Sequence, residues 1–178
     1  MTSTLMKKLV IILGWIAVSS PFAVSQCNAP EELRTELTEK YAGWKVVTLG
    51  TLSKDDRDTW ESMHPRQCPG ILRGKFVDER ESFAIALVQK QATRPTVREQ
   101  VVLFEKQGAE LRATVLVSPR ELAIVNVLVK LPPGRYSSFD DSKKIKTTTD
   151  AIAVVQLEAR ALLLYWDGVQ FKALPWSY

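Results

Sequence analysis

The stretch Ser82–Lys90, SFAIALVQK, decides the fold of this chain. Successive side chains of an extended strand point to opposite faces, so its residues divide into two alternating sets. These sets are Phe83, Ile85 and Leu87 on one face and Ala84, Ala86 and Val88 on the other. Because both faces are apolar, the stretch is predicted to be a central strand that is covered on both sides.

A helix predicted at the start of the domain can provide one of these covers. The segment Asn28–Tyr41 has Pro30 in its first turn, where the missing N–H of proline costs nothing. Leu33, Leu37 and Tyr41 recur every four residues, which places them on one face of the helix. We therefore expect this helix to pack its apolar stripe against the sheet.

The middle of the chain is predicted to consist mainly of strands. Ser53 and Asp56 have the spacing of a capping box and predict a short helix that reaches Met63. Runs of β-branched and aromatic residues predict further strands at Trp44–Leu49, Ile71–Phe76, Gln100–Lys106 and Leu111–Val117. Residues 118–131 fit either a helix that starts at Ser118 or a strand over 122–131, and residues 137–150 are predicted to be a loop.

The C-terminal part carries the clearest hairpin pattern. Strands are expected at Ala151–Gln156, Arg160–Trp166 and Val169–Leu174, and Asp167-Gly168 is a type I′ turn signature between the last two. The fold class predicted from the whole pattern is α+β. The N-terminal helix would pack on one mostly antiparallel sheet of about six to eight strands, which ends in a C-terminal β-hairpin.

The first 25 residues have the three parts of a secretory signal peptide. Lys7 and Lys8 precede an apolar stretch at Leu9–Val18, and Ala23-Val24-Ser25 offers small residues before a cleavage site. The stretch is shorter than the roughly 20 apolar residues that a membrane-spanning helix needs. We expect residues 1–25 to be a cleaved signal and residues 26–178 to be a single domain, exported to the periplasm or the medium and not inserted in a membrane.

The two cysteines, Cys27 and Cys68, would both remain in the exported domain. An even number of cysteines in an exported chain favours a disulfide, which here would tie the N-terminus of the domain to its body. Lipidation of Cys27 is the alternative. The bulky polar Gln26 precedes it, whereas a lipoprotein signal has a small residue at that position.

The charge of the exported domain does not indicate a nucleic-acid partner. The chain has 24 basic and 20 acidic residues, and Lys7 and Lys8 fall within the signal. The domain therefore carries 22 basic and 20 acidic residues, a formal charge of +2. A nucleic-acid-binding domain usually carries a basic stripe with interleaved aromatic residues, and we expect none here.

Residues that could support chemistry are few. His64 is the only histidine, and no spacing typical of metal ligands surrounds it. Asp78, Glu79 and Glu81 could act as an acid–base group or as calcium ligands, but their position between two strands is typical of a solvated hairpin tip. Trp166 is a candidate for an exposed aromatic surface. We expect no cofactor and no metal.

Three segments resemble parts of known protein groups. CPGILRGKFVDERESFAIAL (68–87), PPGRY (132–136) and LLLYWDGVQFKAL (162–174) together resemble a group of uncharacterised exported bacterial proteins, which implies export and fold more than activity. The first segment also distantly resembles an FG-GAP repeat of integrin-type propellers. Lys75 stands where those repeats have aspartate, and Val77–Arg80 lacks the glycines of their calcium loop.

These features lead to an expectation about function at the level of class. We expect a non-enzymatic envelope or secreted domain that binds another macromolecule. An inhibitor or immunity-type protein that acts on an exported enzyme is one alternative. A small hydrolase is another, with His64 and Asp78–Glu81 as its first candidate residues.

Overall fold

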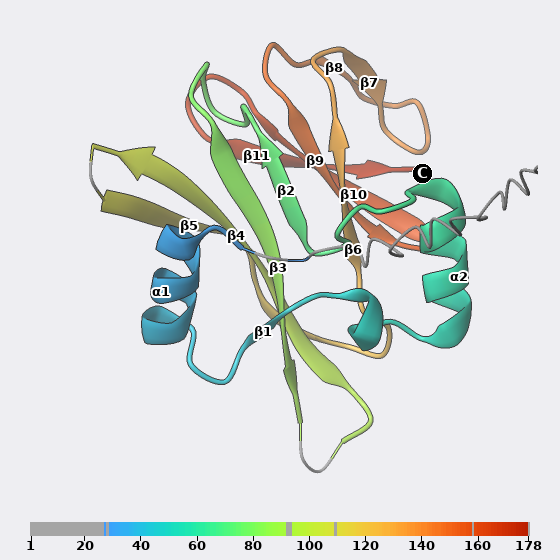
Figure 1. Cartoon of the computed structure of the whole chain (residues 1–178). Helices are drawn as coiled ribbons and strands as arrows, with labels where there is room; N and C mark the ends of the chain where they lie inside the picture. Colours follow the sequence, from blue (N-terminus) through green and yellow to red (C-terminus); the bar gives the residue numbers. More distant parts are fainter. Residues whose placement is uncertain (1–26, 28, 92–93, 109, 158, 178) are drawn as a thin grey trace, which may run out of the picture.

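The computed structural model describes residue 27 and residues 29–91, 94–108, 110–157 and 159–177 (Figure 1). The signal peptide predicted over residues 1–25 lies outside these residues. Two α-helices, α1 (Glu31–Lys40) and α2 (Lys54–Met63), lie on opposite sides of the molecule, and a short 3-10 helix, η1 (Leu49–Thr51), precedes α2. In α2 the Ser53 hydroxyl accepts a hydrogen bond from the N–H of Asp56, which confirms the predicted cap.

The strands form two main sheets and one small hairpin, and all of the described pairings are antiparallel. The first sheet has the order β1-β3-β4-β5, and β2 also pairs with β3. Its strands are β1 (Lys45–Val46), β2 (Ile71–Gly74), β3 (Ser82–Lys90), β4 (Val97–Gln107) and β5 (Glu110–Leu122). The second sheet has the order β11-β10-β9-β6. Its strands are β6 (Val127–Leu131), β9 (Ala151–Gln156), β10 (Arg160–Trp166) and β11 (Phe171–Trp176), and the small hairpin consists of β7 (Arg135–Ser137) and β8 (Lys144–Lys146).

The main core lies between the two sheets. From the first sheet it contains Ala84, Ala86 and Val88 of β3 together with residues of β4, all of them buried. From the second sheet it contains buried residues of β6, β9 and β10. Trp60 of α2 joins the same core, and its indole N–H donates to the Gln67 carbonyl at 3.0 Å.

The opposite face of the first sheet carries α1. Phe83, Ile85 and Leu87 belong to a second apolar cluster together with the helix residues Leu33, Leu37 and Tyr41. The β3 strand is thus covered on both faces, and its predicted bounds are confirmed. The apolar stripe of the helix packs where its four-residue spacing had placed it.

One edge of the first sheet joins the second sheet. The N–H of Leu128 in β6 donates to the Pro69 carbonyl at 2.7 Å, just before β2. Just after β2, the N–H of Asp150 donates to the Lys75 carbonyl at 3.0 Å, and the N–H of Lys75 donates to the Asp150 carboxylate at 2.9 Å. We call this set of contacts the β2–β6 junction. The far edges of the two sheets are β5 and β11, which among the described strands pair only with β4 and β10.

The segment Cys68-Pro69-Gly70 is where several strands meet. Cys68 forms a disulfide with Cys27, which confirms the predicted bridge. The Gly70 carbonyl accepts from the N–H of Ala86 at 2.9 Å. A Cβ atom at Gly70 would lie 2.3 Å from the Val47 carbonyl oxygen, so a side chain cannot be accommodated without moving the backbone. The segment is therefore structural.

The structure corrects several predictions of detail. The strands form two facing sheets and not one, because the β2–β6 junction connects them without a continuous ladder. Residues 118–131 form the end of β5 and then β6, and the predicted loop 137–150 contains part of the β7–β8 hairpin. The C-terminal hairpin is present, but Trp166 pairs with Phe171, so its loop has four residues and not two. The Asp167 carboxylate accepts from the N–H groups of Val169 and Gln170 and stabilises this longer loop.

Candidate functional site

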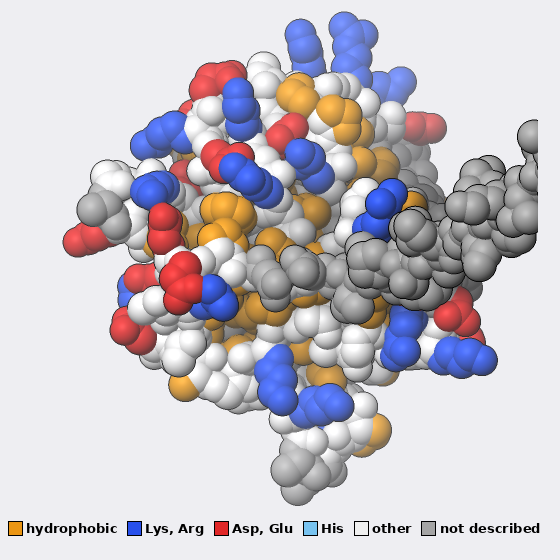
Figure 2. All heavy atoms as spheres, viewed as in Figure 1, with side chains coloured by type: hydrophobic (Ala, Val, Ile, Leu, Met, Phe, Trp, Pro, Cys, Tyr) orange, Lys and Arg blue, Asp and Glu red, His pale blue; other side chains and the backbone are white. Residues whose placement is uncertain are grey.

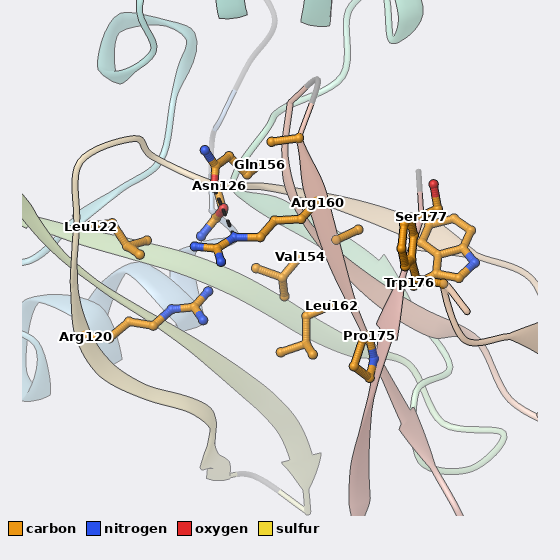
Figure 3. A pocket seen from close by; sticks show the side chains of 13 residues that line it. Arg120, Leu122, Asn126, Val154, Gln156, Arg160, Leu162, Pro175, Trp176 and Ser177 are labelled. Carbon is orange, nitrogen blue, oxygen red and sulfur yellow. Dashed lines mark hydrogen bonds between the residues drawn. The ribbon is translucent and has the colours of Figure 1, made fainter. Parts of the chain in front are cut away.

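A cavity of about 450 Å³ lies on the side where the two sheets are not joined. It is bordered by the end of β5, by β9 and β10, and by the end of β11. Figure 3 shows this arrangement from close by. Its size is within the range of about 300–1,000 Å³ that is typical of small-molecule sites.

The floor and one wall of the cavity are apolar. Val154 and Leu162 face each other across the β9–β10 ladder and provide the floor. Pro175 and Trp176 of β11 form the wall, and the indole of Trp176 is held edge-on to the Tyr136 ring, with centroids 6.3 Å apart. This ring contact orients the Trp176 side chain in the wall.

Phe139 completes the apolar part although 77% of its surface is exposed. Its backbone N–H donates to the Pro175 carbonyl at 3.1 Å, which holds the loop between β7 and β8 against β11. The carboxylate of Asp140 accepts hydrogen bonds from the Ser138 and Ser142 hydroxyls, and these bonds lower the pKa of Asp140 to about 2. A large aromatic side chain is thus presented to solvent by an ordered loop.

The other end of the cavity is polar and basic. In Figure 3 the guanidinium groups of Arg120 and Arg160 approach from different strands and point toward the same part of the cavity. Arg160 Nε donates to the Gln156 side-chain oxygen at 3.3 Å, which orients its guanidinium group. Among the described residues that line the cavity, none is acidic. The cavity therefore has an apolar part and a positively charged part.

A fully buried carboxylate stands behind this basic end. Glu99 of β4 has an exposed fraction of 0%. One of its oxygens accepts from the backbone N–H of Asn126 at 2.8 Å, and the other accepts from Asn126 Nδ2 at 2.7 Å. Arg120 Nη2 lies 3.7 Å from the second oxygen. Burial raises the pKa of the Glu99 carboxyl, and the Asn126 hydrogen bonds and the Arg120 charge partly oppose this rise.

A larger groove of about 650 Å³ lies at the start of α1, beside the β4–β5 turn. Its cations already have carboxylate partners, since Arg73 pairs with Glu81 and Lys106 pairs with Glu32 at 3.2 Å. Acidic and basic side chains lie next to each other around α1, on the left of the view in Figure 2. The groove thus has no uncompensated charge for a ligand, and the smaller cavity is the stronger candidate.

The acidic residues singled out in the sequence lie in the connection between β2 and β3. The Asp78 carboxylate bonds Arg80 at 2.6 Å, Glu79 bonds Lys75 at 2.7 Å, and Glu81 is paired with Arg73. Each carboxylate is thus bound to a neighbouring cation, as in a solvated hairpin tip. Within the described ranges, no group of three or more His, Cys, Asp or Glu side chains could hold a metal ion.

The other two sequence candidates lie in different parts of the fold. Trp166 ends β10 and packs edge-on against Phe171, with centroids 5.4 Å apart. His64 follows α2, and the centroid of its ring lies 4.3 Å from the centroid of the Trp60 ring. Burial lowers the pKa of His64. The structure does not bring these residues together with Asp78–Glu81 into one site.

Sequence reasoning did not identify the residues of the cavity. Arg120 and Arg160 lie far apart in the sequence, and each resembles an ordinary charged residue at the end of a strand. Glu99 did leave a signal, because it falls between Val97 and Val101 on an apolar strand face. The predicted strand began at Gln100, so this signal was missed.

Comparison with known proteins adds no assignment: no protein-family model, curated protein or solved structure matches this chain. Among the described residues, no helix has the length and apolar character needed to cross a bilayer.

Proposed function

We propose that this protein is an exported, non-enzymatic binding domain whose cavity between β5 and β11 binds a small organic anion with an apolar body. One observation carries the proposal. Two guanidinium groups, those of Arg120 and Arg160, face a partly apolar cavity, and none of the described residues that line this cavity is acidic. A small ligand replaces the macromolecular partner expected from the sequence, because the two guanidinium groups converge on one cavity and are not spread over a surface.

The chemistry of the two ends defines the ligand. Guanidinium groups form charge-assisted hydrogen bonds with carboxylate and related oxyanions, and these are about twice as strong as neutral hydrogen bonds. Beyond them, Val154, Leu162 and Trp176 offer only apolar contact. An aromatic acid satisfies both ends, because its ring can lie on the floor while its carboxylate reaches the arginines.

The binding of 2-naphthoate tests this proposal by isothermal titration calorimetry. We expect the oxidised domain, residues 26–178, to bind 2-naphthoate, and we expect the neutral 2-naphthylmethanol to bind at least tenfold more weakly. Arg120→Gln and Arg160→Gln should each reduce the affinity for 2-naphthoate about tenfold, because each removes one charge-assisted bond.

Arg112→Gln is the matched control for both arginine variants. Arg112 lies on β5, as Arg120 does, and is exposed, but it does not line the cavity. It should therefore leave the affinity unchanged. If wild-type protein fails to bind 2-naphthoate, or if Arg112→Gln weakens binding as much as Arg120→Gln, the proposed function is wrong.

The export part of the proposal rests on the disulfide and on the predicted signal. Disulfides persist in oxidising compartments and are rare in the cytosol. Intact mass spectrometry of protein from its native host, alkylated before denaturation, should give a chain that begins at Gln26 and carries no alkyl group. An uncleaved chain, an alkylated cysteine or a lipid adduct on Cys27 would contradict this part.

A further inference from the structure

We infer that Glu99 is a specificity-determining residue of the cavity and restricts its ligands to anions with a single negative charge. This inference rests on the proposed function. It depends on the geometry behind the basic end, where Glu99 touches Arg120 and Asn126 and both of these residues line the cavity. Glu99 therefore contributes its charge to the site without being accessible to the ligand.

The charges of the described groups at this end can be counted. Arg120 and Arg160 contribute two positive charges. We assign one negative charge to Glu99, because both of its oxygens accept hydrogen bonds from Asn126 and Arg120 lies 3.7 Å away, so the net charge is +1. A monoanion brings this total to zero. A dianion leaves one negative charge without a counter-charge beside the buried Glu99 carboxylate, and like charges at short distance repel.

Neighbouring charges on the same strands are engaged elsewhere. Arg98 of β4 lies over the ring of Trp44, 5.7 Å from its centroid, on the side of the sheet that carries α1. Glu121, directly after Arg120 on β5, pairs with Arg94 at 3.0 Å. Neither residue lines the cavity. Glu99 is therefore the described carboxylate whose removal changes the charge at the basic end most directly.

Hydrogen bonding explains how the sheet retains a buried carboxylate here. A buried ionised group is tolerated when hydrogen bonds and a counter-charge satisfy it. Asn126 provides two donors and Arg120 provides the charge. Glu99 of β4 in turn links Asn126, just before β6, to Arg120 on β5. Glu99, Asn126 and Arg120 therefore shape the site and also set its charge.

Three probes with one ring system separate charge from shape. These probes are 2-naphthoate, methyl 2-naphthyl phosphate and 2-naphthyl phosphate, titrated by calorimetry at pH 8. The first two are monoanions. The third is a dianion, because the second pKa of a phosphate ester is about 6. Wild-type protein should bind both monoanions and should bind the dianion about tenfold more weakly.

Glu99→Gln should remove this selectivity. It deletes the negative charge and keeps one hydrogen-bond acceptor for Asn126, so the affinity for 2-naphthyl phosphate should rise about tenfold relative to 2-naphthoate. Glu121→Gln is the matched control, since it deletes one negative charge beside Arg120 but outside the cavity. It should leave the ratio of the two affinities unchanged.

The outcomes distinguish this inference from the proposed function. If no probe binds wild-type protein, the proposed function fails and the inference fails with it. If the probes bind but wild-type protein does not discriminate the dianion, the inference alone is overturned, and this result needs no variant. Equal affinity ratios for Glu99→Gln and Glu121→Gln, in variants with wild-type circular dichroism, would also overturn the inference alone.

Discussion

Replacing Cys27 and Cys68 together with alanine is expected to lower the free energy of unfolding by about 4 kcal/mol. The disulfide joins residues that are 41 positions apart, and removing it restores the entropy of this loop to the unfolded chain. The loop that the disulfide closes contains α1, which covers the first sheet, and α2, which supplies Trp60 to the main core, so removing the bridge affects both helices.

Urea unfolding followed by circular dichroism measures this effect. Wild-type protein treated with reductant provides the matched control, because it loses the bridge without any change of side chain. The reduced wild type and Cys27→Ala/Cys68→Ala should therefore unfold at the same urea concentration. A loss below about 1 kcal/mol in the double variant would show that the N-terminal segment is held by packing and not by the bridge.

Phe104→Ala is expected to have an effect of similar size, about 3–5 kcal/mol. Phe104 of β4 is fully buried under α1, and Tyr41 packs edge-on against its ring with centroids 5.9 Å apart. Alanine would leave a cavity between helix and sheet that the surrounding residues can fill only partly. The variant should unfold at a much lower urea concentration than wild-type protein.

Phe139→Ala is the matched control for Phe104→Ala, because the same side chain is removed from an exposed position. It should change the free energy of unfolding by no more than about 0.5 kcal/mol. It should weaken 2-naphthoate binding several-fold, since Phe139 lines the cavity. A large loss of stability in Phe139→Ala, or a small one in Phe104→Ala, would contradict the assignment of these two rings to surface and core.

Several elements were predictable because their signals are local. The strands β3, β9 and β10 have the bounds that their apolar pattern predicted. The stripe of α1 and the cap of α2 also depend on residues close together in the sequence. The disulfide was predictable from the even number of cysteines together with the expected export, since two cysteines allow only one pairing within the chain.

Other features depend on contacts between distant segments, which a local pattern does not encode. The division into two sheets follows from the β2–β6 junction, where Leu128 bonds to Pro69. The short β7–β8 hairpin has a polar outer face, and only Tyr136 and Ile145 pack on the second sheet. A polar segment of this kind has the composition of a loop.

The cavity was unpredictable for the same reason. Its charged end forms only because β5 and β10, which belong to different sheets, approach each other on the side away from the β2–β6 junction. The two strands do not pair with each other. The predicted candidates Asp78, Glu79, Glu81 and Trp166 stand out in the sequence only by residue type. Their ion pairs and ring contact were not visible in the sequence.

The two sheets also have a consequence for how the chain acquires its structure. The first sheet uses residues 45–122 and the second uses residues 127–176, so each sheet is contiguous in the sequence. During synthesis from N-terminus to C-terminus, the inner face of the first sheet emerges before the strands that bury it. Small apolar residues such as Ala84, Ala86 and Val101 then stay exposed to water until β6 and β9 arrive. The period after the first sheet has emerged and before the second sheet covers it is therefore the stage at which the chain is most prone to aggregation.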